Sequence, residues 1–534
     1  MTKKVCIIGG GATGVALLWC LAQDADACQE WEVTLIHDQP QLGGHSLAYP
    51  VPRNGKTLYI DIGVQFISPM LYPNVHEMLK RPEFKSRVPV FDYDSLKIAC
   101  SFPPDETGAP LNWGNFPAYQ QGDNFALYSP AMADDAKVFE AFIEFSLLTG
   151  WGGKTLQSYF DNPPGPFQYQ EEQRFINYLL KPYLSIINGY GSALMDETTF
   201  GDMFPLFAKL PFVKETPLGS FTQPGKGWQR FTNGASSWVQ AMADVAAQTM
   251  TPQIILKTKA TAVWTDTSAN NIVHVTWQGQ DGSANEGTFD KVVLTTDMWT
   301  NAALLDNDQN NSLWNELYVH YIDKSLWPLM PGKCYIHTDE SMLSPYLREE
   351  QETLQFNAAY APGTTDGNYN LSKTFTTYIQ KNVLGNPDAE GLYLTMYGYI
   401  PDPSAGDKVP DPNKVLFEEN WTHGKWTPSF MGGAKKELHL AQGLGNVSYP
   451  EQKDSNVYFA GNNTTTDSEE GALDSAMIMA DYAFSIQYPL GANPLAFAMY
   501  YIYKHEVMFP GQDASSKIAH LHRLLGGREG TITP

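Results

Sequence analysis

The start of the chain alternates short and long runs of apolar residues. Residues 5–8 and 33–36 form short apolar runs, and a longer apolar run occupies residues 15–22 between them. Short runs of this kind are typical of buried parallel strands, and the longer run predicts a helix that packs on their sheet. We therefore predict a strand, a helix and a second strand in that order.

Three glycines separate the first predicted strand from the helix. Gly9 permits a tight turn, Gly11 has no side chain to block a pyrophosphate, and Gly14 lets the helix pack closely on the sheet. The helix is expected to begin beside Ala12 and Thr13, where free N–H groups and the positive end of the helix dipole favour phosphate. The spacing predicts a dinucleotide-binding unit with these five residues at the cofactor.

The pattern changes twice further along the chain. Residues 71–224 carry aromatic and apolar residues at helical spacing and are punctuated by prolines, which predicts a mostly helical insertion. From residue 225 a helix and alternating strands follow, and residues 291–296 are expected to form a buried strand. Strands of a second sheet are expected at 334–337, 375–379 and 392–397.

Length, charge and cysteine content restrict the class of protein. A chain of 534 residues predicts two or three domains, and a net charge of −23 argues against nucleic acid as a partner. Its five cysteines show no CxxC spacing, so we expect no disulfide framework and no metal site. No apolar run approaches the roughly 20 residues that span a membrane. We expect a cytoplasmic protein with reduced thiols.

A second glycine pair follows the second predicted strand. Gly43 and Gly44 lie where a second turn approaches the diphosphate in one flavoprotein superfamily, and His45 and Ser46 come directly after them. With these residues the chain resembles the flavin amine oxidase and phytoene desaturase superfamily, which implies FAD as the cofactor and these four residues as contacts.

The acidic residue that this superfamily usually places at the end of the second strand is absent. Counting back from the glycine pair gives His37, whose neighbour is Asp38. Either the Asp38 carboxylate or one ring nitrogen of His37 can accept the hydrogen bonds of the adenosine ribose. The resemblance also implies a backbone contact to the adenine near Val263.

The resemblance continues near the C-terminal end. A buried strand at 456–459 runs into Gly461 and Asn462, and a helix is expected to begin near Glu469. In the superfamily this turn reaches the diphosphate and ribityl chain, and the helix start faces the flavin pyrimidine ring. The residues implied here as cofactor contacts are Gly461, Asn462, Gly471, Ala472, Leu473 and Ala476.

A narrower resemblance covers most of the chain. Short motifs such as Gly43-Gly44-His45 and His337-Thr338-Asp339 are similar to those of predicted flavoproteins encoded beside cyclopropane fatty acid synthases. The stretch from Ser468 to Gly471 departs from the His-Glu-Asp-Gly run common in that group. This resemblance implies a lipid-like substrate.

The expected fold is α/β, with a discontinuous Rossmann-like FAD-binding domain and a substrate domain of mixed sheet and helices, as in two-domain amine oxidases. We expect the FAD-binding domain at 1–70, 225–300 and 445–490, the substrate domain at 71–224 and 301–444, and a helical tail at 491–534. The tail combines aromatic and basic residues. One expectation is that the tail contacts a membrane surface or forms a lid over the site. The other, which we favour, is that it packs on the body of the protein.

Three residues are candidates for catalysis. Lys333 lies where many amine oxidases hold a lysine near flavin N5, and burial would lower its pKa; the alternative is a surface lysine. His45 is expected beside the cofactor or in a structural role. Tyr397 belongs to a set of tyrosines that would either line the flavin or fill the core.

These observations favour an FAD-dependent oxidoreductase that takes a hydride from an apolar, acyl or isoprenoid substrate at flavin N5. The second hypothesis is an FAD-dependent double-bond isomerase without net redox change, and the third is an amine oxidase. A flavin-binding structural or regulatory protein is the alternative outside enzymes. An apolar tunnel is expected between the insertion and the second sheet.

Overall fold

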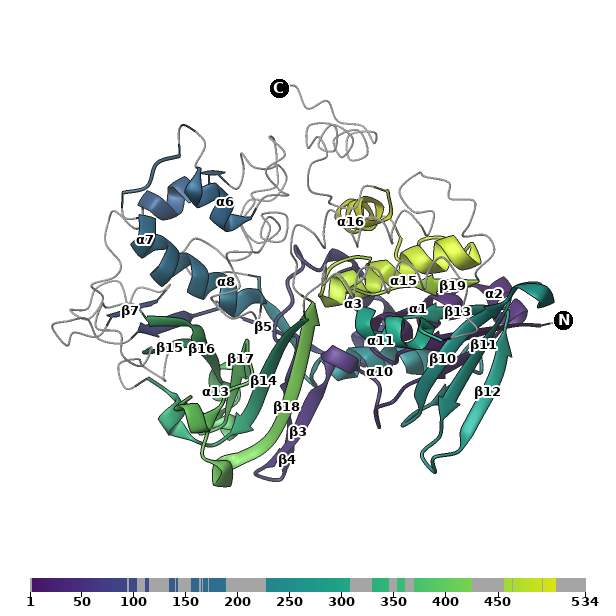
Figure 1. Cartoon of the computed structure of the whole chain (residues 1–534), viewed down its shortest axis with the longest axis horizontal. Helices are drawn as coiled ribbons and strands as arrows, with labels where there is room; N and C mark the ends of the chain where they lie inside the picture. The colour runs from purple at the N-terminus through teal and green to yellow at the C-terminus, as the bar shows by residue number, and fades with distance from the viewer. Residues whose placement is uncertain are drawn as a thin grey trace.

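The computed structural model describes most of both expected domains. The residues described are 2–93, 96–102, 111–114, 134–139, 141–142, 155–162, 165, 167–170, 172–188, 227–307, 329–344, 353–360, 369–424, 456–462, 464–491 and 493–505. Figure 1 shows two sheets as the main layers, with helices α1 and α15 near one and α6, α7 and α8 near the other.

A parallel sheet of five strands forms the core of one half. In spatial order the strands are β19 (Val457–Phe459), β13 (Lys291–Leu294), β1 (Lys3–Ile8), β2 (Trp31–Ile36) and β9 (Gln253–Ile255). All four pairings are parallel. Segments far apart in the sequence therefore build one Rossmann-like sheet, and the predicted α/β fold is confirmed.

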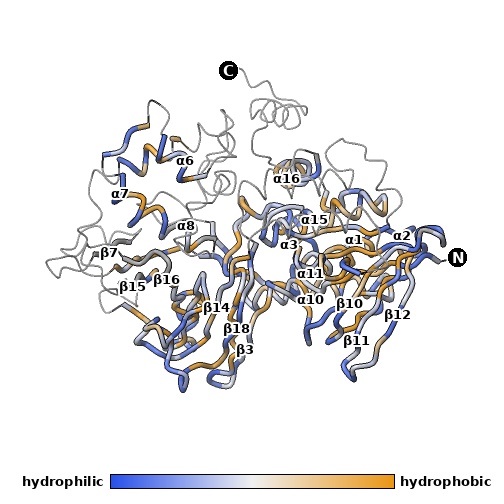
Figure 2. Tube along the Cα trace, viewed as in Figure 1, coloured by the Kyte–Doolittle hydropathy of each residue, from blue (hydrophilic) through white to orange (hydrophobic). Residues whose placement is uncertain are grey.

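Both faces of this sheet are covered. Val5 and Ile7 of β1 point into a core shared with three helices, whereas Cys6 and Ile8 point into a core on the opposite face. The three helices are α1 (Ala12–Ala22), α10 (Ala235–Ala246) and α15 (Glu469–Phe484), and α1 packs against the other two. Every residue of α1 is buried, which agrees with its orange trace in Figure 2.

The opposite face packs against a small antiparallel sheet. Its strands are β10 (Lys259–Asp266), β11 (Ile272–Gln278) and β12 (Ala284–Phe289), and helix α11 (Met298–Leu305) lies beside it. Alternate residues of β11, such as Val273 and Val275, point into the shared core because successive side chains of a strand point to opposite faces.

A mixed sheet of seven strands forms the second half. Its order is β18 (Val415–Gly424), β14 (Leu329–His337), β17 (Tyr393–Tyr397), β16 (Tyr369–Ile379), β15 (Leu354–Tyr360), β6 (Ile98–Phe102) and β7 (Leu111–Gly114). Only β15 and β6 pair in parallel among the strands described in this sheet. The strands expected at 334–337, 375–379 and 392–397 are confirmed.

The expected helical insertion contains strands as well as helices. Its described helices are α3 (Pro73–Lys80), α4 (Pro82–Lys85), α6 (Leu156–Asp161), α7 (Glu172–Phe175) and α8 (Lys181–Asn188), with a π-helical turn at Ile176–Leu180. The prediction of a mostly helical segment was incomplete, because β6 and β7 join the large sheet and β5 (Val90–Asp92) pairs with β8 (Gln229–Phe231).

The remaining elements are short. They are α2 (Ala25–Glu30), α13 (Gln380–Val383), the ribbon of β3 (Ala48–Arg53) and β4 (Lys56–Asp61), and the 3-10 turns η1 (Gly44–Ser46), η6 (Thr267–Ala269), η7 (Glu340–Met342), η8 (Pro387–Ala389), η9 (Pro403–Ala405) and η10 (Pro412–Lys414). Among the helices described, none is both long and apolar enough to cross a bilayer.

The described part of the C-terminal tail is a helix that packs on the body. Helix α16 (Pro494–His505) contacts α15 and α3. The Tyr500 hydroxyl donates to Asp481 at 2.8 Å, and the Asn74 amide donates to the Ala496 carbonyl at 2.9 Å. The packed alternative is confirmed for this helix, and the rest of the tail, 506–534, lies outside the described residues.

Candidate functional site

The turn from β1 into α1 has the geometry that its glycines predict. Gly9 has a φ of +115°, a conformation that side chains rarely adopt. A Cβ atom on Gly14 would lie 1.9 Å from the Gly9 carbonyl oxygen, so α1 can approach the turn only with glycine there. The position of α1 on the sheet therefore depends on both residues.

Gly11 is glycine for a different reason. Its φ of −73° suits any residue, and a Cβ atom built there meets no atom of the described residues closer than 3.9 Å. Neither the backbone nor the packing of the protein requires glycine, so the space in front of Gly11 is open to a ligand. Gly11 also gives α1 no side-chain cap, which leaves the first N–H groups of the helix available to an anion.

The second glycine turn lies directly against the first. The Gly43 N–H donates to the Gly10 carbonyl at 2.9 Å, and Gly11 forms an isolated parallel bridge with Gly43. A Cβ atom on Gly44 would lie 3.1 Å from the Gly11 Cα. Gly43 and Gly44 have φ values of +145° and +57°. The structure thus joins the two turns that the sequence predicted at one cofactor.

The third motif reaches the same place from the far end of the chain. Gly461 has a φ of +105°, and a Cβ atom there would lie 3.6 Å from the Thr13 hydroxyl oxygen. The Gly461 N–H donates to the Ser475 hydroxyl at 2.7 Å, which fixes the turn on α15. A Cβ atom on Gly471 would lie 2.2 Å from the Thr466 carbonyl oxygen, so the start of α15 needs glycine.

The other predicted contacts of this motif lie on the same turn and helix. Asn462 is half-buried at the turn, and Ala472, Leu473 and Ala476 follow in the first two turns of α15. Leu473 and Ala476 are fully buried in the core that α15 shares with α1.

His37 and Asp38 have different surroundings. The His37 Nδ1 accepts a hydrogen bond from the Gly10 N–H at 3.1 Å, and its Nε2 lies 3.1 Å from the Gln41 carbonyl oxygen. Burial lowers the pKa of His37, which suits a neutral ring with Nε2–H donating to Gln41. Both ring nitrogens are used by the backbone, whereas the Asp38 side chain is 55% exposed.

Val263 and Ser46 are both buried. Val263 points into the core between the two sheets, and its carbonyl accepts from the Asn307 amide at 3.1 Å. Ser46 lies at the end of η1 and hydrogen-bonds the buried carboxyl of Glu469. Burial raises the pKa of Glu469 to about 8, so this side chain is mainly a neutral acid at pH 7.

The three catalytic candidates are not brought together. Lys333 and Tyr397 are paired across β14 and β17, and they lie on the face of the large sheet opposite to Cys334. Trp421 donates to the Cys334 thiol at 3.0 Å and packs on His45, with ring centroids 4.9 Å apart. Of the three candidates, His45 is the one at the glycine turns.

Lys333 and Tyr397 have partners on their own face. Lys333 lies 3.1 Å from Glu418 and over the Tyr335 ring. Burial acts to lower the pKa of Lys333, but the hydrogen bonds that its ammonium donates to Glu418 and Tyr335 outweigh burial and raise the pKa. The expectation of a lowered pKa was therefore wrong. The Tyr397 hydroxyl donates to the Lys408 carbonyl at 2.6 Å.

Sequence reasoning missed a group of rings and a carboxylate around His45. His423 lies 5.2 Å from His45 between ring centroids, and its Nδ1 lies 3.0 Å from an Asp467 carboxylate oxygen. Desolvation by the surrounding protein atoms and the neighbouring His423 lower the pKa of His45, even though the residue is in contact with solvent. Burial acts to raise the pKa of Asp467, but the hydrogen bond and charge of His423 hold it below its usual value.

A buried ion pair anchors the segment that follows the second turn. Arg230 and Asp61 lie 3.2 Å apart, and each is 3% exposed. Asp61 also accepts from the Ala235 N–H at 2.6 Å, at the start of α10. Burial outweighs these partners and raises the pKa of Asp61 to about 6. This network fixes the β3–β4 ribbon on the parallel-sheet half.

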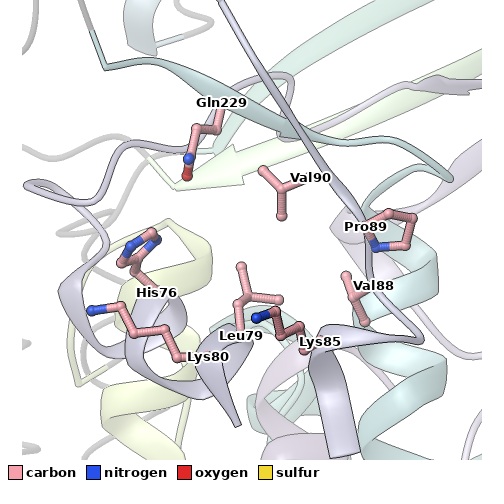
Figure 3. A pocket seen from close by; sticks show the side chains of 8 residues that line it. All are labelled: His76, Leu79, Lys80, Lys85, Val88, Pro89, Val90 and Gln229. Atoms are coloured by element: carbon pink, nitrogen blue, oxygen red, sulfur yellow. The ribbon is translucent and has the colours of Figure 1, made fainter. Parts of the chain in front are cut away.

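A separate pocket of about 260 Å³ lies among α3, α4, β5 and β8. Figure 3 shows its lining, which includes His76, Lys80 and Lys85. The Lys80 ammonium pairs with Glu77 on the same helix. None of the predicted cofactor or catalytic residues lines this pocket, so it is distinct from the glycine turns.

Comparison with known proteins identifies the family. A model of the flavin containing amine oxidoreductases matches residues 24–483. The chain belongs to this family. It is a flavin-containing oxidoreductase, and its cofactor is FAD. The family favours an enzyme over the structural or regulatory alternative. Among curated protein sequences nothing matches the chain.

Several solved structures share the fold at low identity. An oxidoreductase from Methanosarcina mazei is 15% identical, with a TM-score of 0.55 over 90% of this chain and 100% of that one. A putative protoporphyrinogen oxidase from Exiguobacterium sp. 255-15 is 13% identical, with a TM-score of 0.51 over 90% and 99%. A reduced UDP-galactopyranose mutase is 12% identical, with a TM-score of 0.53 over 91% and 94%.

The residues at the glycine turns fit FAD. The open space at Gly11 and the uncapped start of α1 suit the diphosphate. The adjoining Gly43–Gly44 turn borders the same space. Bound FAD supplies an acceptor for a hydride at N5. The start of α15, which Ser468 caps by accepting from the Gly471 N–H at 3.0 Å, holds the third motif in place.

Proposed function

We propose that this flavoenzyme oxidises an apolar, lipid-like substrate with an acyl or isoprenoid chain, and passes the hydride to flavin N5. The observation that carries the proposal is the apolar character of the sheet face that meets His45. Trp421, Cys334 and Ile336 share that face and belong to one core cluster. These residues are buried in the folded protein, and an apolar core of this kind beside the glycine turns is the lining expected of a pocket for a hydrocarbon chain.

The carboxylates beside this face support the same substrate class. Asp61 is held by Arg230, Asp467 is held by His423, and Glu469 is a neutral acid. A charged amine would need an ionised carboxylate to offset its desolvation. Arg230 already offsets the charge of Asp61, and Glu469 carries none, which disfavours the amine oxidase hypothesis.

We assign the cofactor contacts as follows. The first N–H groups of α1 and the Gly43–Gly44 turn hold the diphosphate, and Asp38 accepts from the adenosine ribose, because both nitrogens of His37 are used. His45 lies at this site, whereas Lys333 and Tyr397 support the sheet behind Trp421. We further propose that the protein works in the cytoplasm.

Ligand-dependent thermal stability tests the substrate class. A ligand that binds only the folded protein raises its free energy of unfolding by RT ln(1 + L/Kd), where L is the free ligand concentration, and the unfolding temperature rises with it. We expect long-chain unsaturated fatty acids or polyenes to stabilise the FAD-loaded protein, with short-chain acids of the same charge as the matched control. Stabilisation by polyamines alone would contradict the proposal and support an amine oxidase.

A further inference from the structure

The group around His45 contains the donor atoms of a metal site. His45, His423 and Asp467 each offer one ligand atom, and these atoms lie within 4.8 Å of one another. They come from three elements: η1, β18 and the turn before α15. Two imidazoles and one carboxylate are ligands that zinc and other divalent transition metals accept. We propose that this triad binds one divalent transition cation, with zinc as the first candidate.

The surrounding structure positions the two imidazoles. His423 and Trp421 lie on the same face of β18, because they are two residues apart on one strand, and their rings stack at 17°. Trp421 is held by its hydrogen bond to the buried Cys334 thiol and packs on His45. The His45 backbone is fixed against Gly63, where a Cβ atom would lie 1.9 Å from the His45 carbonyl oxygen.

The local charge favours a cation. Asp467 supplies a carboxylate, and Asp297 adds a second negative charge that acts on His45. The His423 Nδ1 atom lies 3.0 Å from an Asp467 carboxylate oxygen, a contact that fits one hydrogen-bonded proton. A divalent cation would replace this proton, since a metal-bound imidazole nitrogen carries none. The second carboxylate oxygen of Asp467 can then bind the same cation.

The site would remain open on one side. The side chains of His423 and Asp467 are 22% and 24% exposed, and His45 is exposed. Three protein ligands with an open position are typical of metal sites that also bind water or a substrate oxygen. The proposal gives His45 the role of a ligand, and it does not depend on the substrate class proposed above.

Metal analysis of the purified FAD-loaded protein tests the proposal. After metal removal with a chelator, the protein is equilibrated with Zn²⁺ and dialysed, and we expect about one zinc ion per chain to remain. His45→Ala, His423→Ala and Asp467→Asn should each weaken zinc binding by more than roughly 10–100-fold. That range is the usual loss when a residue that only hydrogen-bonds a metal ligand is removed, and these variants remove a ligand itself. His274→Ala is the matched control, because His274 pairs with Glu286 on the remote small sheet.

A second measurement avoids dependence on the variants. Co²⁺ added to the wild-type protein should give visible absorption bands of a nitrogen- and oxygen-ligated site, and Zn²⁺ should abolish them. Failure of the FAD-loaded wild type to retain zinc and to develop these bands would overturn the proposal. Equal zinc retention in the wild type and all three ligand variants would overturn it too. The FAD absorbance of the same samples reports separately on the cofactor.

Discussion

Two glycines three residues apart have different physical roles, and this difference is testable. Gly11→Val places a side chain in open space, so we expect the protein without FAD to fold with a free energy of unfolding within about 0.5 kcal/mol of wild type. The same change should abolish FAD binding, because the side chain would occupy the diphosphate space. Gly14→Val should prevent folding, since its Cβ would overlap the Gly9 carbonyl.

Circular dichroism and the flavin absorbance of the purified variants separate these effects. If Gly11→Val retained FAD, the assignment of the diphosphate to this turn would be wrong. Unfolding of Gly11→Val to the same extent as Gly14→Val would show that packing, and not the cofactor, requires glycine at both positions.

The ribose contact is also decided at a single residue. Asp38→Ala should weaken FAD binding by roughly 1–3 kcal/mol, the usual cost of losing a hydrogen bond to a charged group. Asp281→Ala, on the exposed β11–β12 turn, is the control. FAD release on dilution, followed by fluorescence, measures the change. A loss of FAD in His37→Ala with none in Asp38→Ala would reverse the two roles.

Sequence patterns located the glycines but not the residues around His45. Gly9, Gly43 and Gly461 lie in local sequence motifs, and each has a positive φ that favours glycine. Trp421, His423 and Asp467 are brought to His45 by the pairing of β18 with β14 and by the position of α15, so their proximity has no local signal. The pKa of Lys333 was mispredicted for the same reason, because its partner Glu418 lies on β18.

Helices α15 and α3 are joined by two buried acids whose protonation should control stability. Glu470 accepts from the Asn74 and Val75 N–H groups at the start of α3, and the Asn74 amide donates to Asp474. Burial raises the pKa of Glu470 to about 7, and burial with the nearby Glu470 charge raises the pKa of Asp474 well above its usual value. The folded protein therefore keeps a proton that the unfolded chain releases.

The pH dependence follows from this difference. Between about pH 5 and pH 7 the folded state binds more protons than the unfolded state, so the stability due to this pair falls as pH rises. Asp474→Asn should raise the free energy of unfolding by roughly 1–3 kcal/mol near pH 8 and by less near pH 5. Denaturant unfolding at both values measures it, with the exposed Asp244→Asn as control. An equal effect at both values would contradict the account.

Elements with strong local patterns were predictable, and those that depend on distant partners were not. Strand β1 and helices α1 and α15 follow from their apolar runs and flanking glycines. In contrast, β6 and β7 lie in a segment with helical spacing. Strand β6 pairs with β15 from another part of the chain, and β7 pairs with β6. Strand formation depends on such cross-strand neighbours more than on intrinsic preference.

At the scale of the whole molecule, three segments far apart in the sequence build the proposed cofactor site beside an apolar sheet. The turns at Gly11, Gly43 and Gly461 meet because β1, β2 and β19 lie in one parallel sheet. The order of the motifs was enough to predict this half. The position of the large sheet beside it, with Trp421 against His45, required the structure.

Anaerobic mixing of the FAD-loaded protein with candidate substrates tests the central claim most directly. An acyl or isoprenoid substrate that donates a hydride should bleach the visible flavin band, and the bleaching should last until an electron acceptor is added. Product formation with only transient or no bleaching would contradict net oxidation and support the isomerase. Lasting bleaching by amines, with none by lipid-like compounds, would contradict the proposed substrate class.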